Sequence, residues 1–300
     1  MKLRYDAGEV ITAMVTPFDK NLNIDYHALE KVINHLIESG SDAILVAGST
    51  GESSTLTHDE EINIFKFVKE KVNGRVKIIL GAGSNSTETA VEVSKNAELL
   101  GADAILTVVP YYNKPSQKGM YEHFSDIAKA TKLPIILYNI PGRTGVNMMP
   151  QTIAQLANDF DNIVAVKQSN PDLDLISDIK KLCPSDFAIY SGDDSLTLPM
   201  LALGAHGVIS VASHVSGVEV KEMVQAYKDG CVKFALEKHL KLYPLFKKIF
   251  IAPNPVPIKE ALSKMGLVEN YVRKPLVVLD EDEKADFYSV VSDYLKSPVK

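Results

Sequence analysis

The sequence contains only two cysteines, Cys183 and Cys231, and no CxxC pair. This predicts neither a disulfide framework nor a zinc site, and it is typical of a chain that folds in a reducing compartment. Its histidines, among them His58, His206 and His214, show no HxxxH-type spacing. We therefore expect the histidines to be structural or surface groups, and we expect no metal site.

Long apolar runs and clusters of basic residues are also missing. No apolar segment approaches the ~18 residues that a membrane span needs, and the N-terminus MKLRYDAGEV has no apolar stretch before a cleavage site. The net charge is −6, and no lysine- or arginine-rich run offers a surface for nucleic acid. We expect a cytoplasmic protein that binds neither membranes nor nucleic acids.

The sequence instead alternates regularly between two kinds of segment. Amphipathic stretches of helical period separate eight short apolar runs, at residues 10–18, 43–48, 77–83, 104–110, 134–141, 163–169, 187–194 and 206–213. Continuous apolar runs of this length indicate parallel strands covered by helices. Eight units in unbroken order favour an α/β fold of the (β/α)8 (TIM) barrel type over a doubly wound open sheet.

The strand pattern ends after the eighth run. Three helical segments follow it, CVKFALEKHLKLYPLFKKIF, PVPIKEALSKMG and DEDEKADFYSVVSDYLKS. We assign residues 1–229 to a catalytic barrel and residues 230–300 to a C-terminal three-helix subdomain. Within the barrel, Thr57 and Glu60 have the spacing of a capping box at the start of a helix.

Polar residues gather where the predicted strands end, which is the face that carries the chemistry in such barrels. The second run ends in GSTGES, the fourth in PYYNKPS, the fifth in YNIPGRTG and the seventh in SGDD, while the sixth contains Lys167. An ammonium removed from water loses its proton or finds a partner, so Lys167 is a candidate functional residue. The alternative is a lysine at a strand end that extends its ammonium into solvent.

These residue types predict aldol chemistry that needs no metal. A deprotonated lysine condenses with a ketone to form a Schiff base, and the iminium lets the adjacent carbon lose a proton. Tyr138 can move protons at that carbon, with Ser49 and Tyr112 as relay partners. The GST turn offers backbone donors for one carboxylate, and Arg143 can bind a second carboxylate through two hydrogen bonds.

Two other motifs have simpler explanations. Asp193 and Asp194 are adjacent and point in opposite directions, so we expect helix capping rather than a pair of acid/base carboxylates. Residues 81–86, GAGSNS, only half match a dinucleotide-binding loop and lack its last glycine, so we expect a turn there.

The assembled motifs resemble the dihydrodipicolinate synthase and N-acetylneuraminate lyase family of class I aldolases, and the synthase branch most closely. The resemblance covers nearly the whole chain and rests on GSTGESSTLTHDE, PYYNKPSQKG, LYNIPGRTG, the lysine strand, SGDD, GVIS and PNPVPIK. It implies that Lys167 forms a Schiff base with pyruvate without any cofactor. It further implies that Tyr138 transfers protons and that Ser49 and Tyr112 complete its relay.

The resemblance also implies the substrates and the assembly. The synthase reaction condenses pyruvate with aspartate semialdehyde to 4-hydroxy-tetrahydrodipicolinate, on the way to diaminopimelate and lysine. The pyruvate carboxylate would bind at Thr50 and the aldehyde's carboxylate at Arg143, with backbone of Gly192 and Ile209 lining the pocket. Family members are commonly homotetramers built from tight dimers, in which the residue matching Tyr112 reaches the neighbour's site.

Two positions depart from the synthase pattern. Synthases usually have two threonines where this chain has Ser49 and Thr50, and a glutamate where it has Gln168. Both changes lean toward N-acetylneuraminate lyase or another pyruvate-dependent sugar-acid aldolase. Arg143 favours the synthase, because the short adduct of the two substrates resembles a dicarboxylate and needs a bidentate partner, whereas a sugar does not. A catalytically silent barrel used for binding is the remaining alternative.

Feedback inhibition by lysine is a separate question. Sensitive members of the family bind lysine at a dimer interface, through positions that match Ser53, His58, Asn85 and Tyr111. This chain has Glu61 where a sensitive enzyme often has histidine, and Thr89 where it has the glutamate expected to hold the effector's ammonium. We therefore predict weak or absent inhibition by lysine.

Overall fold

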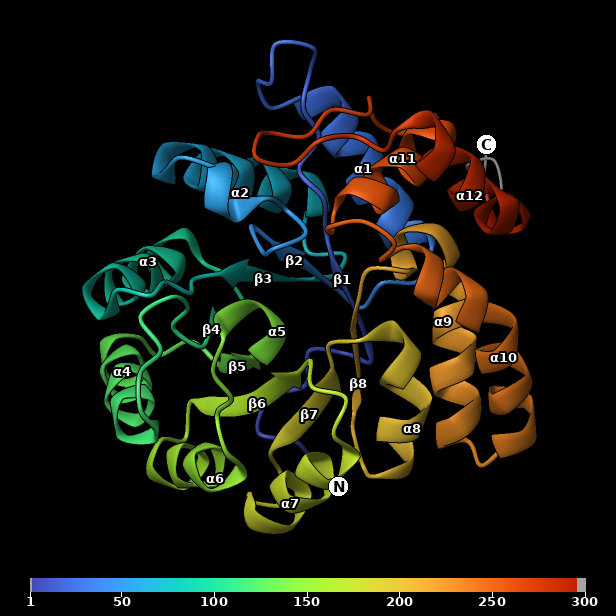
Figure 1. Cartoon of the computed structure of the whole chain (residues 1–300). Helices are drawn as coiled ribbons and strands as arrows, with labels where there is room; N and C mark the ends of the chain where they lie inside the picture. The colour runs from blue at the N-terminus through green and yellow to red at the C-terminus, as the bar shows by residue number, and fades with distance from the viewer. Residues whose placement is uncertain (1, 296–300) are drawn as a thin grey trace. The chain divides into compact units, whose positions relative to one another are not determined.

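The computed structural model describes residues 2–295, in which eight strands follow one another in a closed barrel (Figure 1). The strands are β1 (Val10–Ala13), β2 (Ala43–Val46), β3 (Lys77–Gly81), β4 (Ala104–Val108), β5 (Ile135–Asn139), β6 (Ile163–Gln168), β7 (Ala188–Ser191) and β8 (Gly207–Ser210). Strand β1 pairs in parallel with β2, and each strand from β3 to β7 pairs in parallel with the next one. The predicted (β/α)8 barrel is confirmed.

Helices follow the strands as the amphipathic stretches predict. The barrel helices are α1 (Tyr26–Glu38), α2 (His58–Val72), α3 (Thr87–Leu100), α4 (Gln117–Ala130), α5 (Pro141–Thr144), α6 (Pro150–Asp159), α7 (Leu173–Leu182), α8 (Thr197–Ala202) and α9 (Ser213–Lys228). The C-terminal helices are α10 (Val232–Lys248), α11 (Val256–Lys264) and α12 (Glu281–Val291). Each lies within one of the three predicted segments, and the last two residues of the third segment, 296–297, lie outside the described residues. Short 3-10 turns lie at η1 (Ser53–Thr55), η2 (Asp194–Leu196) and η3 (Ser292–Tyr294).

Several strands are shorter than the apolar runs that predicted them. The first run covers residues 10–18, but β1 ends at Ala13. The residues that follow, including Met14, Val15 and Phe18, leave the strand yet stay buried. Hydrophobicity therefore identified burial correctly, whereas the end of the strand depends on where the backbone stops pairing with its neighbour.

Local capping signals act as predicted. The side chain of Thr57 accepts a hydrogen bond from the Glu60 backbone N–H at 3.2 Å, and the Glu60 carboxylate accepts one from the Thr57 N–H at 2.8 Å. These two bonds form the capping box of α2. The GAGSNS segment forms a loop after β3, and its last residue, Ser86, caps α3 through the Thr89 N–H.

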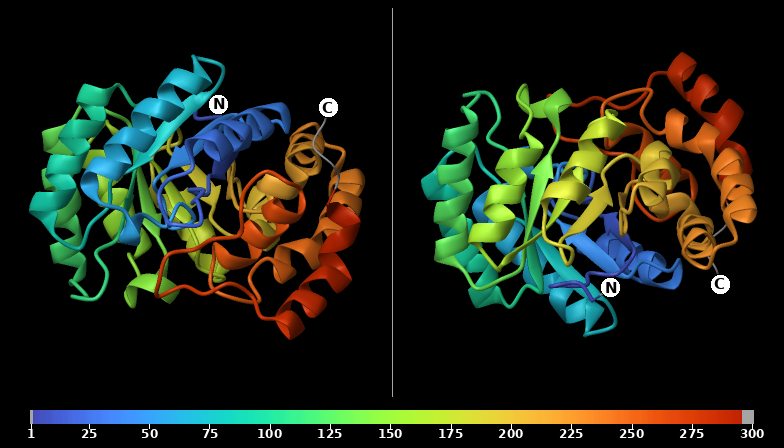
Figure 2. Two further views of the ribbon diagram at one scale, coloured as in Figure 1. Left: turned by 90° about the horizontal axis from the view of Figure 1, so that it is seen from above. Right: turned by 90° about the horizontal axis from the view of Figure 1, so that it is seen from below.

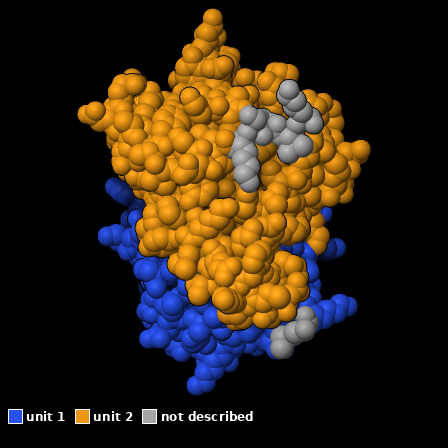
Figure 3. All heavy atoms as spheres, turned by 90° about the vertical axis from the view of Figure 1, so that its right-hand side faces the viewer, with its two compact units in different colours: residues 1–9, 78–209 blue, residues 10–77, 210–300 orange. Residues whose placement is uncertain are grey.

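The chain divides into two compact units, which Figure 3 shows in blue and orange. Unit 1 comprises residues 1–9 and 78–209, and unit 2 comprises residues 10–77 and 210–300. In unit 1, α3, α4, α6 and α7 pack side by side in chain order (Figure 2). In unit 2, α9 packs against α1, α10 and α11, and α10 also packs against α12. The boundary predicted after residue 229 lies inside unit 2 and stays a prediction.

Candidate active site

Lys167 and Tyr138 form a buried pair in unit 1. Lys167 lies on β6 and Tyr138 on β5, directly opposite each other in the strand register. Each is only 6% exposed, so Lys167 is not a surface lysine that extends into solvent. The Lys167 ammonium lies 4.3 Å from the centroid of the Tyr138 ring, a distance at which the electron-rich ring face attracts a cation.

Gly192, directly after β7, provides the space that the lysine side chain occupies. A Cβ atom at this position would lie 2.9 Å from Lys167 Cε and would overlap the hydroxyl oxygen of Ser169. The Gly192 N–H donates to the Gln168 carbonyl at 2.8 Å, which fixes the backbone in place. A side chain at this position would therefore have to displace the side chains of Lys167 and Ser169.

Ser169 is a residue that the sequence reasoning missed. Its hydroxyl is buried and has no hydrogen-bond partner among the described residues, although it lies in the same space as the Lys167 side chain. Ser169 directly follows β6, two residues after Lys167. This spacing was the available signal, because alternate residues of an extended chain face the same side. The neighbouring Gln168 is also buried, and neither polar atom of its side chain has a partner in the described part of the chain.

Arg143 and Ile209 also belong to unit 1. Arg143 lies in α5, immediately after β5, and its side chain is exposed. The end of β5 holds the segment that follows α5, because Asn139 accepts a hydrogen bond from the Met148 N–H at 3.0 Å and donates to Asn147 at 2.8 Å. Ile209 lies on β8 and is 1% exposed.

Tyr112 is placed differently from the buried pair. It follows β4, its backbone has a φ of 72°, and its side chain is 89% exposed. A left-handed backbone is strained for a tyrosine, so the surrounding loop must hold it there. Asn113 contributes by donating from its side-chain amide to the Asn85 carbonyl at 2.8 Å. Because Tyr112 is so exposed, its ring does not pack in the interior of its own chain with Tyr138.

Ser49 and Thr50 belong to unit 2, in the loop between β2 and η1. Ser49 is exposed and Thr50 is buried. The loop is closed by hydrogen bonds from the N–H groups of Gly51 and Ser53 to the Gly48 carbonyl, at 3.0 and 3.3 Å. It therefore forms a compact turn, as the GSTGES motif predicted, and it presents one exposed and one buried hydroxyl.

The four predicted effector residues are divided between the units, with Ser53 and His58 in unit 2 and Asn85 and Tyr111 in unit 1. His58 lies 3.9 Å from the carboxylate of Glu61. Burial raises the pKa of Glu61 to about 7. Glu61, the residue predicted to stand where lysine-sensitive enzymes often have histidine, is therefore a carboxyl group that is only partly ionised near neutral pH.

Asp193, His214 and His206 make structural contacts. The Asp193 side chain accepts a hydrogen bond from the Ser195 N–H at 2.9 Å at the start of η2, which confirms the capping role predicted for Asp193. His214 is fully buried and accepts from the Val15 N–H, and His206 contacts Asp6 at the surface. Across residues 2–295 no three His, Cys, Asp or Glu side chains are grouped so that they could hold a metal ion.

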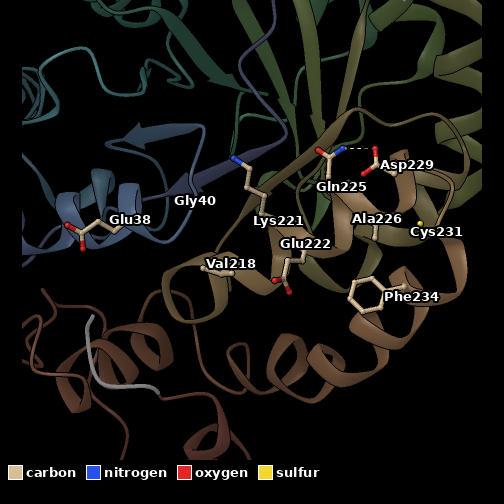
Figure 4. Close-up of a pocket in the computed structure, with 10 residues that line it drawn as sticks. All are labelled: Glu38, Gly40, Val218, Lys221, Glu222, Gln225, Ala226, Asp229, Cys231 and Phe234. Atoms are coloured by element: carbon tan, nitrogen blue, oxygen red, sulfur yellow. Dashed lines mark hydrogen bonds between the residues drawn. The ribbon is translucent and has the colours of Figure 1, made fainter. Parts of the chain in front are cut away.

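A separate pocket of about 530 Å³ lies in unit 2, between the end of α1, α9 and the start of α10 (Figure 4). Several of its polar side chains are paired. Lys221 binds Asp42 at 2.6 Å, and Gln225 donates to Asp229 at 2.9 Å. None of the predicted site residues lines this pocket.

Comparison with known proteins identifies the family. Residues 6–294 match the dihydrodipicolinate synthetase family. The chain belongs to this family. The 4-hydroxy-tetrahydrodipicolinate synthase of Bacillus subtilis is 48% identical over 286 residues, which cover 95% of this chain and 99% of that protein. The enzyme of the same name from Desulforamulus reducens is 49% identical over 272 residues, which cover 91% of this chain and 92% of that protein.

Solved structures of the dihydrodipicolinate synthetase family share the fold. The crystal structure of dihydrodipicolinate synthase from Cyanidioschyzon merolae with lysine bound has a TM-score of 0.95 and 45% sequence identity, and the match covers 98% of this chain and 100% of that one. The chain is thus an enzyme of the dihydrodipicolinate synthetase family, as its motifs predicted. In residues 2–295, no helix combines the length and the hydropathy that crossing a bilayer requires.

Proposed function

We propose that this chain is a 4-hydroxy-tetrahydrodipicolinate synthase, which condenses pyruvate with aspartate semialdehyde through a Schiff base on Lys167. The observation that supports this most directly is the buried Lys167, in register with Tyr138, in a chain of this family. A buried amine next to a phenol has the components for Schiff-base formation and for proton transfer at the adjacent carbon.

The reaction begins when the neutral Lys167 amine attacks the ketone carbon of pyruvate. The carbon–oxygen bond breaks, water leaves and an iminium forms. The pyruvate methyl group then loses a proton to give an enamine, whose carbon attacks the aldehyde carbon of the semialdehyde. The semialdehyde's amino group finally attacks the iminium carbon, and this closes the ring and releases Lys167. Tyr138 lies beside the amine and carries protons to and from these atoms.

Other predicted residues bind the substrates in this proposal. Thr50 and the turn around it take the pyruvate carboxylate, and Ser49 belongs to the proton relay. Arg143 is exposed, and among residues 2–295 its guanidinium has no hydrogen bond or ion pair, so its donors are available for the semialdehyde carboxylate. The backbone at Gly192 and Ile209 lines the pocket beside the lysine.

The proposal includes a homotetramer built from tight dimers, in the cytoplasm. Its support is Tyr112, which is 89% exposed on a strained backbone. An exposed aromatic held in a costly conformation fits a side chain that completes the relay in a neighbouring copy. Mixing Tyr112→Phe and Tyr138→Phe chains tests this arrangement, because a hybrid dimer then contains one intact site. No regain of activity after demonstrated subunit exchange contradicts it.

Trapping of the intermediate tests the function. The protein is incubated with pyruvate and borohydride, its intact mass is measured, and the modified peptide is mapped. We expect one reduced adduct per chain on Lys167, none in Lys167→Arg, and an unchanged adduct in the control Lys129→Arg. Absence of an adduct in folded wild-type protein overturns the proposal. Turnover with N-acetylneuraminate but not with the semialdehyde would assign the alternative aldolase activity instead.

A further inference from the structure

The loop that carries Ser49 and Thr50 is strained at both ends. Ala47 has a φ of 53° and Glu52 a φ of 56°, and neither is a glycine. Side chains disfavour this left-handed conformation, and it persists only where surrounding contacts impose it. The conformation of the GSTGE loop therefore depends on the contacts that hold Glu52 and its neighbours.

The C-terminal part of unit 2 supplies those contacts. The Lys259 ammonium on α11 forms an ion pair with the Glu52 carboxylate, and the two side chains are 0% and 1% exposed. The Arg273 backbone N–H donates to the second oxygen of Glu52 at 2.9 Å. Lys259 also donates to the Tyr271 carbonyl at 2.9 Å, so its position is fixed from two sides. A buried carboxylate with both oxygens bound has little freedom to move.

Asn254, two residues before α11, reaches the same loop. Its side-chain amide donates to the Thr50 hydroxyl oxygen at 2.9 Å, and both residues are buried. A hydroxyl whose oxygen accepts this bond retains its own hydrogen for another partner. The amide oxygen of Asn254 has no hydrogen-bond partner among the described residues. Within that part of the chain, the side chain of Asn254 therefore makes its hydrogen bond to Thr50.

We infer that Asn254 is a positioning residue, which turns the Thr50 hydroxyl so that its hydrogen is donated to the carboxylate of the 2-oxo acid substrate. The Lys259–Glu52 ion pair holds the loop in the conformation that this requires. The inference rests on the proposed function, because it adds a residue to the carboxylate site proposed at Thr50. It gives the C-terminal segment, which contributes none of the predicted catalytic residues, a direct role in substrate affinity.

Asn254→Asp tests the inference with almost no change of shape. An aspartate can only accept from Thr50, so it turns the hydroxyl hydrogen away from the substrate and adds a like charge near the carboxylate. The measured quantity is the pyruvate concentration that gives half-maximal borohydride trapping on Lys167. We expect a rise of tenfold or more, with full trapping at saturating pyruvate and an unchanged KM for the second substrate. Asn73→Asp adds the same charge at an exposed position and should match the wild type.

A double variant shows whether Asn254 acts through Thr50. In a Thr50→Val background, Asn254→Asp should change the half-saturating concentration much less than it does alone, because the hydroxyl that it orients is gone. If Asn254→Asp does not fold, Asn254→Ala removes the donor without adding charge and should raise the value about threefold. A half-saturating concentration within twofold of wild type in the folded variant overturns the inference alone. Failure of the wild type to form any adduct overturns the proposed function as well.

Discussion

The Lys167 ammonium lies 4.3 Å from the centre of the Tyr138 ring, because the two residues occupy paired positions on β5 and β6. This relationship places a phenol directly beside the amine. Strand register brings the two backbones side by side, and the lysine side chain carries its ammonium to the ring. A proton donor held next to a nucleophile removes most of the entropic cost of bringing the two together.

Tyr138→Phe should retain the ring beside Lys167 and remove the hydroxyl. We expect kcat to fall by about 10²- to 10⁴-fold, since positioned proton transfer contributes about that much to catalysis. The ring still contacts the lysine, so borohydride trapping at saturating pyruvate should still modify Lys167. Steady-state kinetics and trapping measure the two effects separately. A kcat within threefold of wild type contradicts the proton-transfer role.

Arg143→Ala should weaken binding of the second substrate alone. Loss of a charged bidentate partner costs about 2–3 kcal/mol, which corresponds to a rise in KM for the semialdehyde of roughly 30- to 150-fold. The half-saturating pyruvate concentration for trapping should stay the same. Arg143→Lys keeps the charge and loses the fork geometry, so it should recover only part of the affinity. Equal effects on both substrates would refute the assignment.

Lysine should inhibit this enzyme weakly or not at all. Thr89 has no carboxylate for the effector's ammonium, and Glu61 replaces the histidine of sensitive enzymes with a carboxyl group whose pKa is about 7. Initial rates across a lysine titration measure this. Strong inhibition at sub-millimolar lysine would show the prediction to be wrong, whereas a gain of inhibition in Thr89→Glu would support its explanation.

Lys259→Met should destabilise the protein strongly. It leaves the Glu52 carboxylate buried without its ion-pair partner, and breaking a buried pair in this way costs about 3–5 kcal/mol. Adding Glu52→Gln removes the unpaired charge, so the double variant should recover much of the lost stability. Urea denaturation of both variants and wild type measures the differences. A double variant as unstable as Lys259→Met contradicts the ion-pair explanation.

The buried imidazole of His214 should make stability depend on pH. Burial lowers its pKa from 6.5 to about 4, and its Nε2 accepts the Val15 N–H at 3.2 Å. The unfolded chain takes up the proton first as pH falls, so stability is lost between about pH 6.5 and pH 4. One pKa unit corresponds to about 1.4 kcal/mol, so the loss from this group is about 3 kcal/mol.

Urea denaturation at several pH values measures this dependence. His214→Gln should flatten it relative to wild type, although His123, whose pKa burial also lowers to about 4, keeps its own contribution. Identical slopes in His214→Gln and wild type would assign the effect to other groups.

The sequence by itself determined the barrel, the C-terminal helices and the candidate lysine. These follow from local chemistry: apolar runs of strand length, amphipathic stretches of helical period, and a charge in the middle of the run at 163–169. It also determined the capping of α2, because Thr57 and Glu60 interact within one turn. Each of these predictions was drawn from residues that are near one another in the chain.

Only the tertiary structure decided which polar groups meet. Asn254 and Thr50 are separated by 204 positions, and Lys259 and Glu52 by 207, so no spacing in the sequence pairs them. The sequence shows the two motifs that contain these residues, PNPVPIK and GSTGES, but not that the motifs meet. The packing of distant segments decides which acceptor a buried donor binds. The register of Tyr138 with Lys167 and the exposure of Tyr112 likewise required the folded chain, because strand pairing and burial are properties of the whole barrel.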